Sequence, residues 1–233
     1  MRVGILVMST ALASGCQSKP SDCGPTPSWA ERGSSSLGEF ISLSDRLAAG
    51  RVRSLNRTVT VLSGGTGLRV AAASGEGLIW LEGTDFSNGT IETAVCGRDI
   101  DSESFVGIAF HRRNDETYEA IYLRPFNFRS RSSDRRQHAV QYIAVPGNDY
   151  GRLRAQSPGE FEHAVDPSVD PNTWNRLRVV VGSGRVQVFV GDAATVALDV
   201  RALQAEGNGQ VGLFVGNGSD GVFTNLRLVR GSR

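Results

Sequence analysis

The sequence predicts an all-β domain in which two antiparallel sheets stack on each other. Short runs of β-branched and aromatic residues recur along the chain, separated by clusters of Gly, Asn, Asp and Pro, as strands and turns require. Glycine is abundant, at 28 of 233 residues. We expect at most a helical turn or two, within Leu43 to Leu55. More than ten strands in one unit of this length indicate a two-layer sandwich.

The clearest strand pair runs from Trp174 to Val190. Apolar residues alternate with arginines up to Val181, a turn of sequence Gly-Ser-Gly follows, and valines then alternate with polar residues. This alternation predicts a hairpin with one buried face. A second pair is expected at Gln210–Gly216 and Gly221–Val229. The same pattern predicts strands at Thr58–Leu62, Leu68–Ala72, Gly77–Glu82, Thr90–Cys96, Phe105–His111, Tyr118–Arg124 and Ala139–Ile143.

The N-terminus has the features of an export signal. Arg2 is followed by an uncharged, mostly apolar run to Ala13 and by two small residues before Cys16, a pattern typical of a cleaved signal peptide. The run is shorter than the ~20 residues of a membrane-spanning helix. The segment Leu12-Ala13-Ser14-Gly15-Cys16 resembles the bacterial lipobox, although a large aliphatic residue is usual where Ala13 stands.

That resemblance implies that residues 1–15 are a lipoprotein signal peptide and that the Cys16 thiol carries lipid. The protein would then lie at a bacterial cell envelope, on the periplasmic or extracellular side, with lipid as its only membrane contact. An ordinary signal peptide with an incidental cysteine is the alternative. Residues 16–37, rich in Ser, Pro and Gly, predict a flexible tether. The domain is expected at residues 38–230.

Two further cysteines, Cys23 and Cys96, remain if Cys16 is lipidated. An even number in an oxidising compartment is compatible with a disulfide, which would tie the start of the mature chain to the domain. Two unpaired thiols are the alternative. The three histidines show no metal-ligand spacing, so no metal or cofactor is expected. A net charge of +1 offers no strong field for nucleic acid or anionic lipid.

Three central strands indicate a ligand groove. One face of each carries apolar residues, and the other mixes very small residues with the large polar residues Glu92, His111, Tyr122 and Arg124. Small residues lower the floor of a sheet, while guanidinium, hydroxyl, imidazole and carboxylate groups hydrogen-bond around it. The alternative is that a loop covers this face and the polar groups pair with each other. The acidic stretch Asp99 to Glu103 is interpreted as a solvated turn rather than as catalytic carboxylates or calcium ligands.

The region from Trp80 to Val229 resembles the concanavalin A-like lectin/glucanase superfamily, and more narrowly its 3-keto-disaccharide hydrolase-like and laminin G-like jelly-roll domains. The residues that carry the resemblance lie at 86–92, 105–112, 118–125, 141–142, 174–177, 212–214 and 223–226. It implies a jelly roll with carbohydrate bound on a concave sheet face, where Glu92, Tyr122, Arg124 and Gln141 would be groove positions. The Glu-x-Asp-x-Glu strand of laminarinase-type members is missing.

Three functions follow as hypotheses. The first is an exported carbohydrate-binding domain, whose partner is a saccharide or glycoside. The second is a glycoside-processing enzyme, with Glu92 or His111 as its base. The third is an envelope module that binds other proteins. Nucleic acid is not expected as a partner of any of them.

Overall fold

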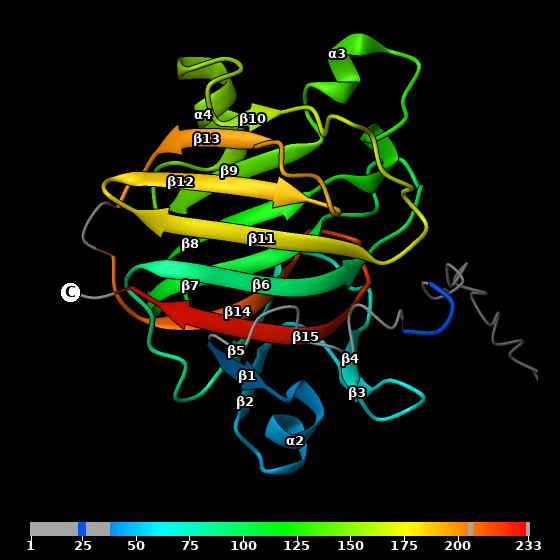
Figure 1. Ribbon diagram of the computed structural model, residues 1–233, viewed down its shortest axis with the longest axis vertical. Helices are drawn as coiled ribbons and strands as arrows, with labels where there is room; N and C mark the ends of the chain where they lie inside the picture. The colour runs from blue at the N-terminus through cyan, green and yellow to red at the C-terminus, as the bar shows by residue number, and fades with distance from the viewer. Residues whose placement is uncertain (1–22, 27–37, 205–206, 232–233) are drawn as a thin grey trace, which may run out of the picture.

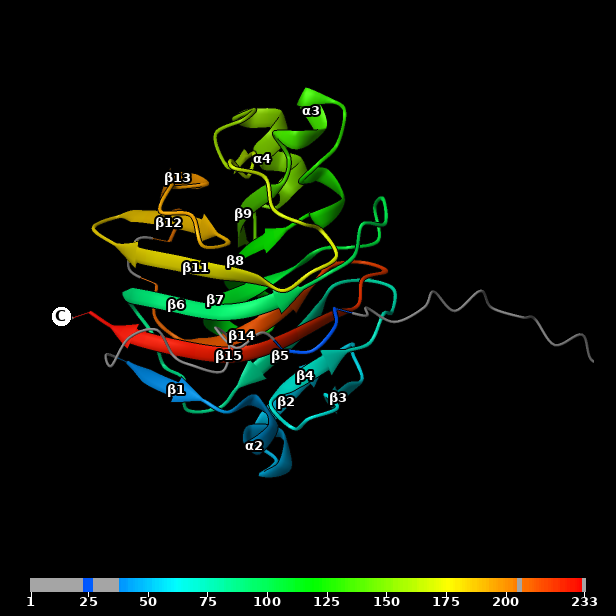
Figure 2. The same cartoon turned by 45° about the vertical axis from the view of Figure 1, so that its right-hand side comes forward.

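The computed structural model describes residues 23–26, 38–204 and 207–231. It confirms an all-β sandwich of two antiparallel sheets, seen as two layers in Figures 1 and 2. Sheet A has the order β13-β12-β11-β6-β15-β4-β3, and β1 also pairs with β15. Sheet B has the order β10-β9-β8-β7-β14-β5-β2.

The strands of sheet A are β1 (Glu39–Ile41), β3 (Val59–Val61), β4 (Gly67–Val70), β6 (Gly89–Cys96), β11 (Asn175–Gly182), β12 (Arg185–Val190), β13 (Leu198–Arg201) and β15 (Gly221–Arg230). Those of sheet B are β2 (Val52–Leu55), β5 (Gly77–Leu81), β7 (Val106–Asn114), β8 (Thr117–Leu123), β9 (Val140–Val145), β10 (Glu162–His163) and β14 (Gln210–Val215). In the described part of the chain, four short helical segments connect them: α2 (Leu43–Ala48), η1 (Pro125–Asn127), α3 (Ser133–Arg136) and α4 (Tyr150–Gln156).

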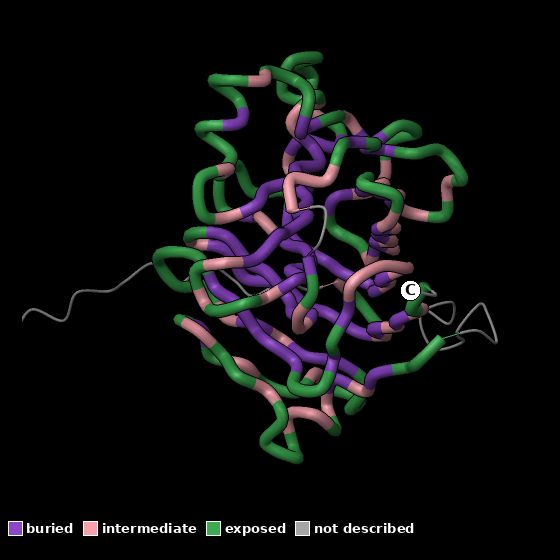
Figure 3. The backbone as a smooth tube through the Cα atoms, turned by 90° about the vertical axis from the view of Figure 1, so that its left-hand side faces the viewer, coloured by how far each residue is buried: buried purple, intermediate pink, exposed green. Residues whose placement is uncertain are grey.

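The hydrophobic core lies between the sheets, where the buried backbone is concentrated in Figure 3. Strand alternation puts it there, because successive side chains point to opposite faces. On β11, Leu177, Val179 and Val181 are buried, and the residues between them are only partly covered. We call the face of each sheet that points away from the other sheet its outer face.

The predicted hairpin between Trp174 and Val190 is confirmed as β11–β12, with Val181 opposite Val186. Ser183 and Gly184 form its turn with φ of 52° and 71°. Positive φ at both central positions is typical of the type I′ turn, whose twist matches that of the flanking strands.

The second predicted strand pair is wrong. The strands form at the expected positions, but β14 pairs with β5 and β7 in sheet B, whereas β15 pairs with β1, β4 and β6 in sheet A. Each strand already has neighbours on both sides in its own sheet. The residues between Val215 and Gly221 therefore cross from one layer to the other, and they do not close a hairpin.

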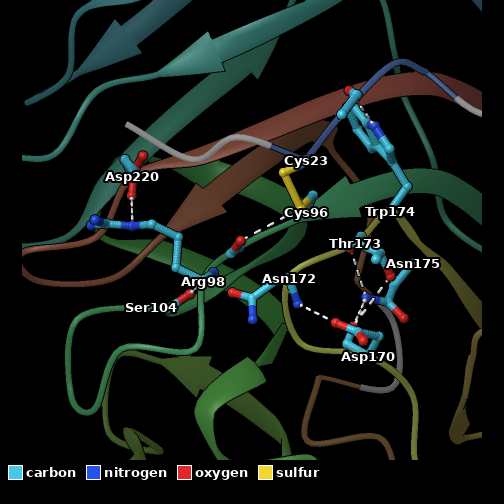
Figure 4. The surroundings of a disulfide bond; sticks show 12 residues. Cys23, Cys96, Arg98, Ser104, Asp170, Asn172, Thr173, Trp174, Asn175 and Asp220 are labelled. Carbon is cyan, nitrogen blue, oxygen red and sulfur yellow. Dashed lines mark hydrogen bonds and ion pairs between the residues drawn. A yellow bond between two sulfur atoms is a disulfide. The ribbon is translucent and has the colours of Figure 1, made fainter. Parts of the chain in front are cut away.

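A disulfide joins Cys23 to Cys96 over a sequence separation of 73 residues. Cys96 ends β6 on the outer face of sheet A, and the Trp174 indole donates a hydrogen bond to the carbonyl of Gly24 (3.4 Å). Figure 4 shows the segment of Cys23 running over the sheet beside Trp174. The bridge therefore holds part of the predicted tether against the domain. No helix in the described part of the chain has the length and apolar character to cross a membrane.

Candidate functional site

The predicted groove residues do not all share one face. Glu92 lies on β6 in sheet A, whereas His111, Tyr122, Arg124 and Gln141 come from sheet B or its immediate continuation. Glu92 is on the outer face of sheet A, 3.9 Å from the guanidinium of Arg176. Alternation along β6 was interpreted correctly, but β6 lies in a different sheet from β7, β8 and β9. The prediction that Glu92 joins the groove is therefore wrong.

His111 was predicted on the same face as Gly107 and Ala109, and this is wrong as well. The pairing of β7 with β8 shifts after Phe110, and His111 adopts a φ of 54°. This bulge turns the imidazole into the interior, where Nδ1 hydrogen-bonds the buried carboxylate of Glu119 and Nε2 lies 2.9 Å from the Ser87 carbonyl. Because a carbonyl only accepts, Nε2 must carry a proton.

Glu119 also accepts a hydrogen bond from the Tyr142 hydroxyl, which itself accepts from the backbone N–H of Leu203 (2.9 Å). The side chains of His111, Glu119 and Tyr142 are all buried. Glu119 lies opposite Phe110 in the strand register, on the face that packs against sheet A. This polar cluster therefore connects core strands to loops and has no access to an open cleft.

Tyr122, Arg124 and Gln141 do come together, at the end of the outer face of sheet B. Arg124 Nη2 donates to the Tyr122 hydroxyl (3.2 Å) and to Gln141 Oε1 (3.2 Å). Its guanidinium also lies 5.1 Å from the centre of the Tyr122 ring. Burial raises the pKa of Tyr122 above its usual value, so the hydroxyl stays protonated and keeps its hydrogen-bonding capacity. Gln141 is buried beneath the cleft and supports Arg124 rather than facing solvent.

Two aromatic rings stack to form the floor of this site, because the residue between them in the sheet is a glycine without a side chain. Tyr122 on β8 and Phe214 on β14 are both opposite Gly107 on the intervening β7. Residues two strands apart are ~10 Å from each other along the sheet, yet the ring centres stack at 5.1 Å. A side chain on Gly107 would prevent this, since its Cβ would lie 2.0 Å from the Ile121 carbonyl oxygen.

An open cleft of about 570 Å³ lies over this floor. Such a volume is within the ~300–1,000 Å³ range of small-molecule sites. Its walls come from both loops and helices, including the turn before β7, η1, α3 and α4. The lining residues are Glu76, Asp101, Ser102, Phe105, Tyr122, Arg124, Phe126, Asn127, Arg135, His138, Tyr150, Arg154, Phe214, Gly216 and Asn217.

A buried carboxylate, Glu162, organises the charges at one end of the cleft. Arg154 donates to both of its oxygens (2.8 and 2.6 Å), His138 Nδ1 lies at 2.8 Å, and Arg124 Nη1 lies at 3.5 Å. Burial alone would raise the pKa of Glu162. The hydrogen bonds from Arg154 and the charges of Arg154, His138 and Arg124 outweigh burial and lower the pKa below its usual value. The carboxylate therefore stays ionised and holds three cationic or basic groups at the cleft.

The opposite walls carry exposed polar groups. Arg135 on α3 pairs with Asp101 and donates to Asn127 Oδ1 (3.3 Å). Glu76 accepts a hydrogen bond from the Tyr118 hydroxyl (2.9 Å). The stretch Asp99 to Glu103 is exposed throughout, which confirms the predicted solvated turn, and Asp101 and Ser102 in this turn also line the cleft.

Several aromatic rings line the cleft. Phe105 lies edge-on to both Tyr122 and Phe126, with ring centres 6.1 and 5.5 Å apart. Tyr150, the first residue of α4, is 53% exposed. Its ring centre lies 5.9 Å from the guanidinium carbon of Arg154. The cleft thus combines flat apolar surfaces with hydrogen-bond donors and acceptors that are held in place by hydrogen bonds to other side chains.

Glu162, Arg154 and Tyr150 are site residues that the sequence patterns did not reveal. They belong to short elements, α4 and β10, whose sequences carry no extended period. Among the described residues, no group of three or more His, Cys, Asp or Glu side chains is placed to hold a metal ion.

No protein-family model matches the sequence, and no curated protein matches it. Several solved structures, however, are similar to this protein. The carbohydrate-binding module CBM66 from Bacillus subtilis aligns with a TM-score of 0.55 at 14% identity, over 76% of this chain and 93% of the module. A Bacillus subtilis protein of unknown function with a galectin-like fold aligns with a TM-score of 0.53 at 12% identity, over 84% of this chain and 99% of that one.

The exoplasmic/lumenal domain of VIP36, in a Ca2+/Man-bound form, also aligns, with a TM-score of 0.53 at 12% identity over 78% of this chain and 84% of that domain. At such identities the similarity concerns the fold. The chain has a jelly-roll sandwich of the concanavalin A-like type.

Proposed function

We propose that this protein is an exported carbohydrate-binding domain whose ligand occupies the cleft over Tyr122 and Phe214. One observation carries the proposal: an open cleft in which the exposed Tyr150 ring and the polar side chains Arg135, Asp101 and Asn217 surround an aromatic floor. Sugars present apolar C–H faces, which pack on aromatic rings, and a rim of hydroxyl groups, which bind such donors and acceptors.

The structural similarities support this proposal from a separate direction. CBM66 is a carbohydrate-binding module by its name, and VIP36 was solved in a Ca2+/Man-bound form. The cleft also bears on the two alternative hypotheses, a glycoside-processing enzyme and a protein-interaction module. It is open rather than covered by its own loops, and neither Glu92 nor His111, the candidate bases of an enzyme, lines it.

We further propose that Cys16 carries lipid and holds the domain at a bacterial envelope, with residues 1–15 removed as a signal peptide. Residues 1–22 lie outside the described part of the chain, so the sequence pattern around Cys16 carries this proposal. Mass spectrometry of the purified N-terminus tests it: a diacylated Cys16 is expected. An unmodified terminus, or cleavage elsewhere, would contradict it.

Saccharide binding is tested on residues 17–233, produced in an oxidising compartment so that the disulfide forms. A glycan array identifies a ligand, and calorimetry measures its Kd for wild type, Tyr150→Ala and Phe40→Ala. Tyr150 and Phe40 are matched, at 53% and 54% exposure, but Phe40 lies on sheet A. Loss of a stacking ring is expected to weaken binding about tenfold in Tyr150→Ala only. No bound saccharide, or equal weakening in both variants, would overturn the proposal.

A further inference from the structure

The charges around the cleft balance one another except at one end. Asp101 pairs with Arg135, and the two charges cancel. Glu76 lies within electrostatic reach of Arg57, whose guanidinium is held beside the cleft by a hydrogen bond to the carbonyl of the lining residue Gly216 (2.8 Å). Each of these two carboxylates therefore has an arginine that compensates its negative charge.

The end of the cleft at Glu162 carries more positive than negative charge. Two arginines, Arg124 and Arg154, surround this one carboxylate, which gives a net charge of +1, and protonation of His138 can only add to it. Among the described residues, neither arginine forms an ion pair with a second carboxylate. Both arginines and His138 line the cleft, whereas Glu162 lies beneath it. A ligand at this end therefore meets the basic groups and not the carboxylate.

Arg154 has hydrogen-bond donors left for a ligand. Its Nε and Nη2 donate to the two oxygens of Glu162, so one edge of the guanidinium is occupied. The other edge, formed by Nη1 and the second N–H of Nη2, can bind a second carboxylate with two parallel hydrogen bonds. No described residue accepts a hydrogen bond from Nη1. The side chain of Arg154 is 41% exposed and that of Arg124 only 5%, so Arg154 is the arginine that a ligand can reach.

The exposed ring of Tyr150 lies beside this arginine. Both residues belong to α4, one helical turn apart, and residues four apart on a helix are neighbours on its surface. The guanidinium carbon of Arg154 lies 5.9 Å from the centre of the Tyr150 ring. A sugar ring packed on Tyr150 would therefore have Arg154 next to it, within reach of an acidic substituent on that sugar.

We propose that the cleft selects acidic saccharides, in which Arg154 binds the carboxylate of a uronic acid whose ring packs on Tyr150. This inference rests on the proposed saccharide binding and names the class of saccharide. Hydrogen bonds between an ionised donor and an ionised acceptor are about twice as strong as neutral ones, so a carboxylate is favoured over the hydroxyl or ester of a neutral sugar. Glu162 holds the other edge of Arg154 and so orients the free edge.

Binding of residues 17–233 to oligomers of galacturonate, mannuronate and glucuronate, each compared with its methyl ester and with neutral saccharides, tests the selection. Each acid and its ester differ only at the carboxyl group. The Kd of the best acidic ligand is expected to be about tenfold lower than that of its ester, and added salt should weaken binding of the acid only. Binding of neutral saccharides but no uronate, or equal Kd values for acid and ester, would overturn the selection and leave the proposed function standing. Binding of no saccharide would overturn both.

Two variants locate the selection. Arg154→Gln is expected to lower the ratio of the ester and acid Kd values from about ten to about one. The matched control Arg185→Gln removes an arginine that is 53% exposed, pairs with Asp199 (2.7 Å) and lies outside the cleft. It should keep the ratio of the wild type. Thermal melting shows whether both variants are folded. An unchanged ratio in Arg154→Gln, or an equal decrease in both variants, would overturn the proposal.

The salt dependence of the wild type decides the question if Arg154→Gln does not fold. Binding of the acid should weaken with added salt while binding of the ester stays constant. The same salt dependence for acid and ester would overturn the proposal.

Discussion

The guanidinium of Arg124 lies 3.5 Å from the carboxylate of Glu162, and their side chains are only 5% and 3% exposed. This pair lies under one end of the cleft, where Glu162 also holds Arg154 and His138. A buried carboxylate is stable only when its hydrogen bonds and charge are compensated. Arg124, Arg154 and His138, which line this end of the cleft, are therefore fixed from beneath by a carboxylate that is not itself a lining residue.

Removing the charge of Glu162 should lower stability in a pH-dependent way. Glu162→Gln is expected to reduce the free energy of unfolding by about 2 kcal/mol at neutral pH, because hydrogen bonds to charged groups are lost. The pKa of Glu162 is lowered in the folded state from a usual value of 4.5. Its contribution is thus present above that value and lost as the pH falls through the lowered pKa.

Urea unfolding of wild type and Glu162→Gln at a series of pH values measures this difference. The two curves should converge in acid as the carboxylate of the wild type becomes protonated. A constant difference from neutral pH into strong acid would contradict the charge assignment.

The buried pair of His111 and Glu119 should contribute more to stability than its hydroxyl partner. Glu119→Ala leaves the imidazole and the Tyr142 hydroxyl without their shared hydrogen-bond partner, and a loss of about 3–5 kcal/mol is expected. Tyr142→Phe removes one hydrogen bond and should cost about 1 kcal/mol. Denaturant melts of the two variants give the comparison, and a Glu119→Ala cost below that of Tyr142→Phe would contradict a structural role for the pair.

The aromatic floor depends on the absence of a side chain at Gly107. Gly107→Ala would place its Cβ 2.0 Å from the Ile121 carbonyl oxygen and 2.6 Å from the Tyr122 Cα. Such overpacking should cost about 3 kcal/mol. Gly182→Ala, also in a strand but with no atom within 4 Å of an added Cβ, serves as the control and should melt like wild type. Equal melting temperatures for both variants would show that the sheet relaxes at Gly107.

The disulfide should stabilise the domain by restricting the unfolded chain. For the 73-residue separation of Cys23 and Cys96, the chain-entropy model gives about 4 kcal/mol. Cys23→Ser/Cys96→Ser is therefore expected to melt at a clearly lower temperature than oxidised wild type, and wild type with reductant should match the variant. Identical melting of all three samples would mean that the bridge closes a loop with no consequence for folding.

Much of the fold could be predicted because strand alternation is a local property. Each predicted strand between Thr58 and Val229 has a counterpart in the structure, and the β11–β12 turn carries its own signal in Ser183 and Gly184. The short strands β1, β2, β10 and β13 were not predicted, because two to four residues give too few alternations. The sheet to which a strand belongs depends on contacts that are distant in sequence. The consecutive strands β14 and β15 were therefore wrongly predicted to pair with each other.

The same distinction between local alternation and non-local strand pairing explains which site residues could be predicted from the sequence. Tyr122 and Arg124 alternate with apolar neighbours on one strand, so their common face could be predicted. Glu92 has the same alternating pattern but lies in the other sheet. His111 follows a bulge in β7 that the alternation of the sequence did not predict. Tyr150, Arg154 and Glu162 reach the cleft through tertiary packing of α4 and β10, a contact that no local pattern encodes.

The central claim is that saccharide binds in the cleft on sheet B, and amide chemical-shift mapping tests it most directly. ¹⁵N-labelled residues 17–233 would be titrated with a saccharide that the glycan array identifies. The shifts are expected to cluster at the cleft, around Asp101 to Phe105, Arg124 to Asn127, Tyr150 to Arg154 and Phe214 to Asn217. Shifts confined to sheet A, or spread evenly over the domain, would contradict the claim.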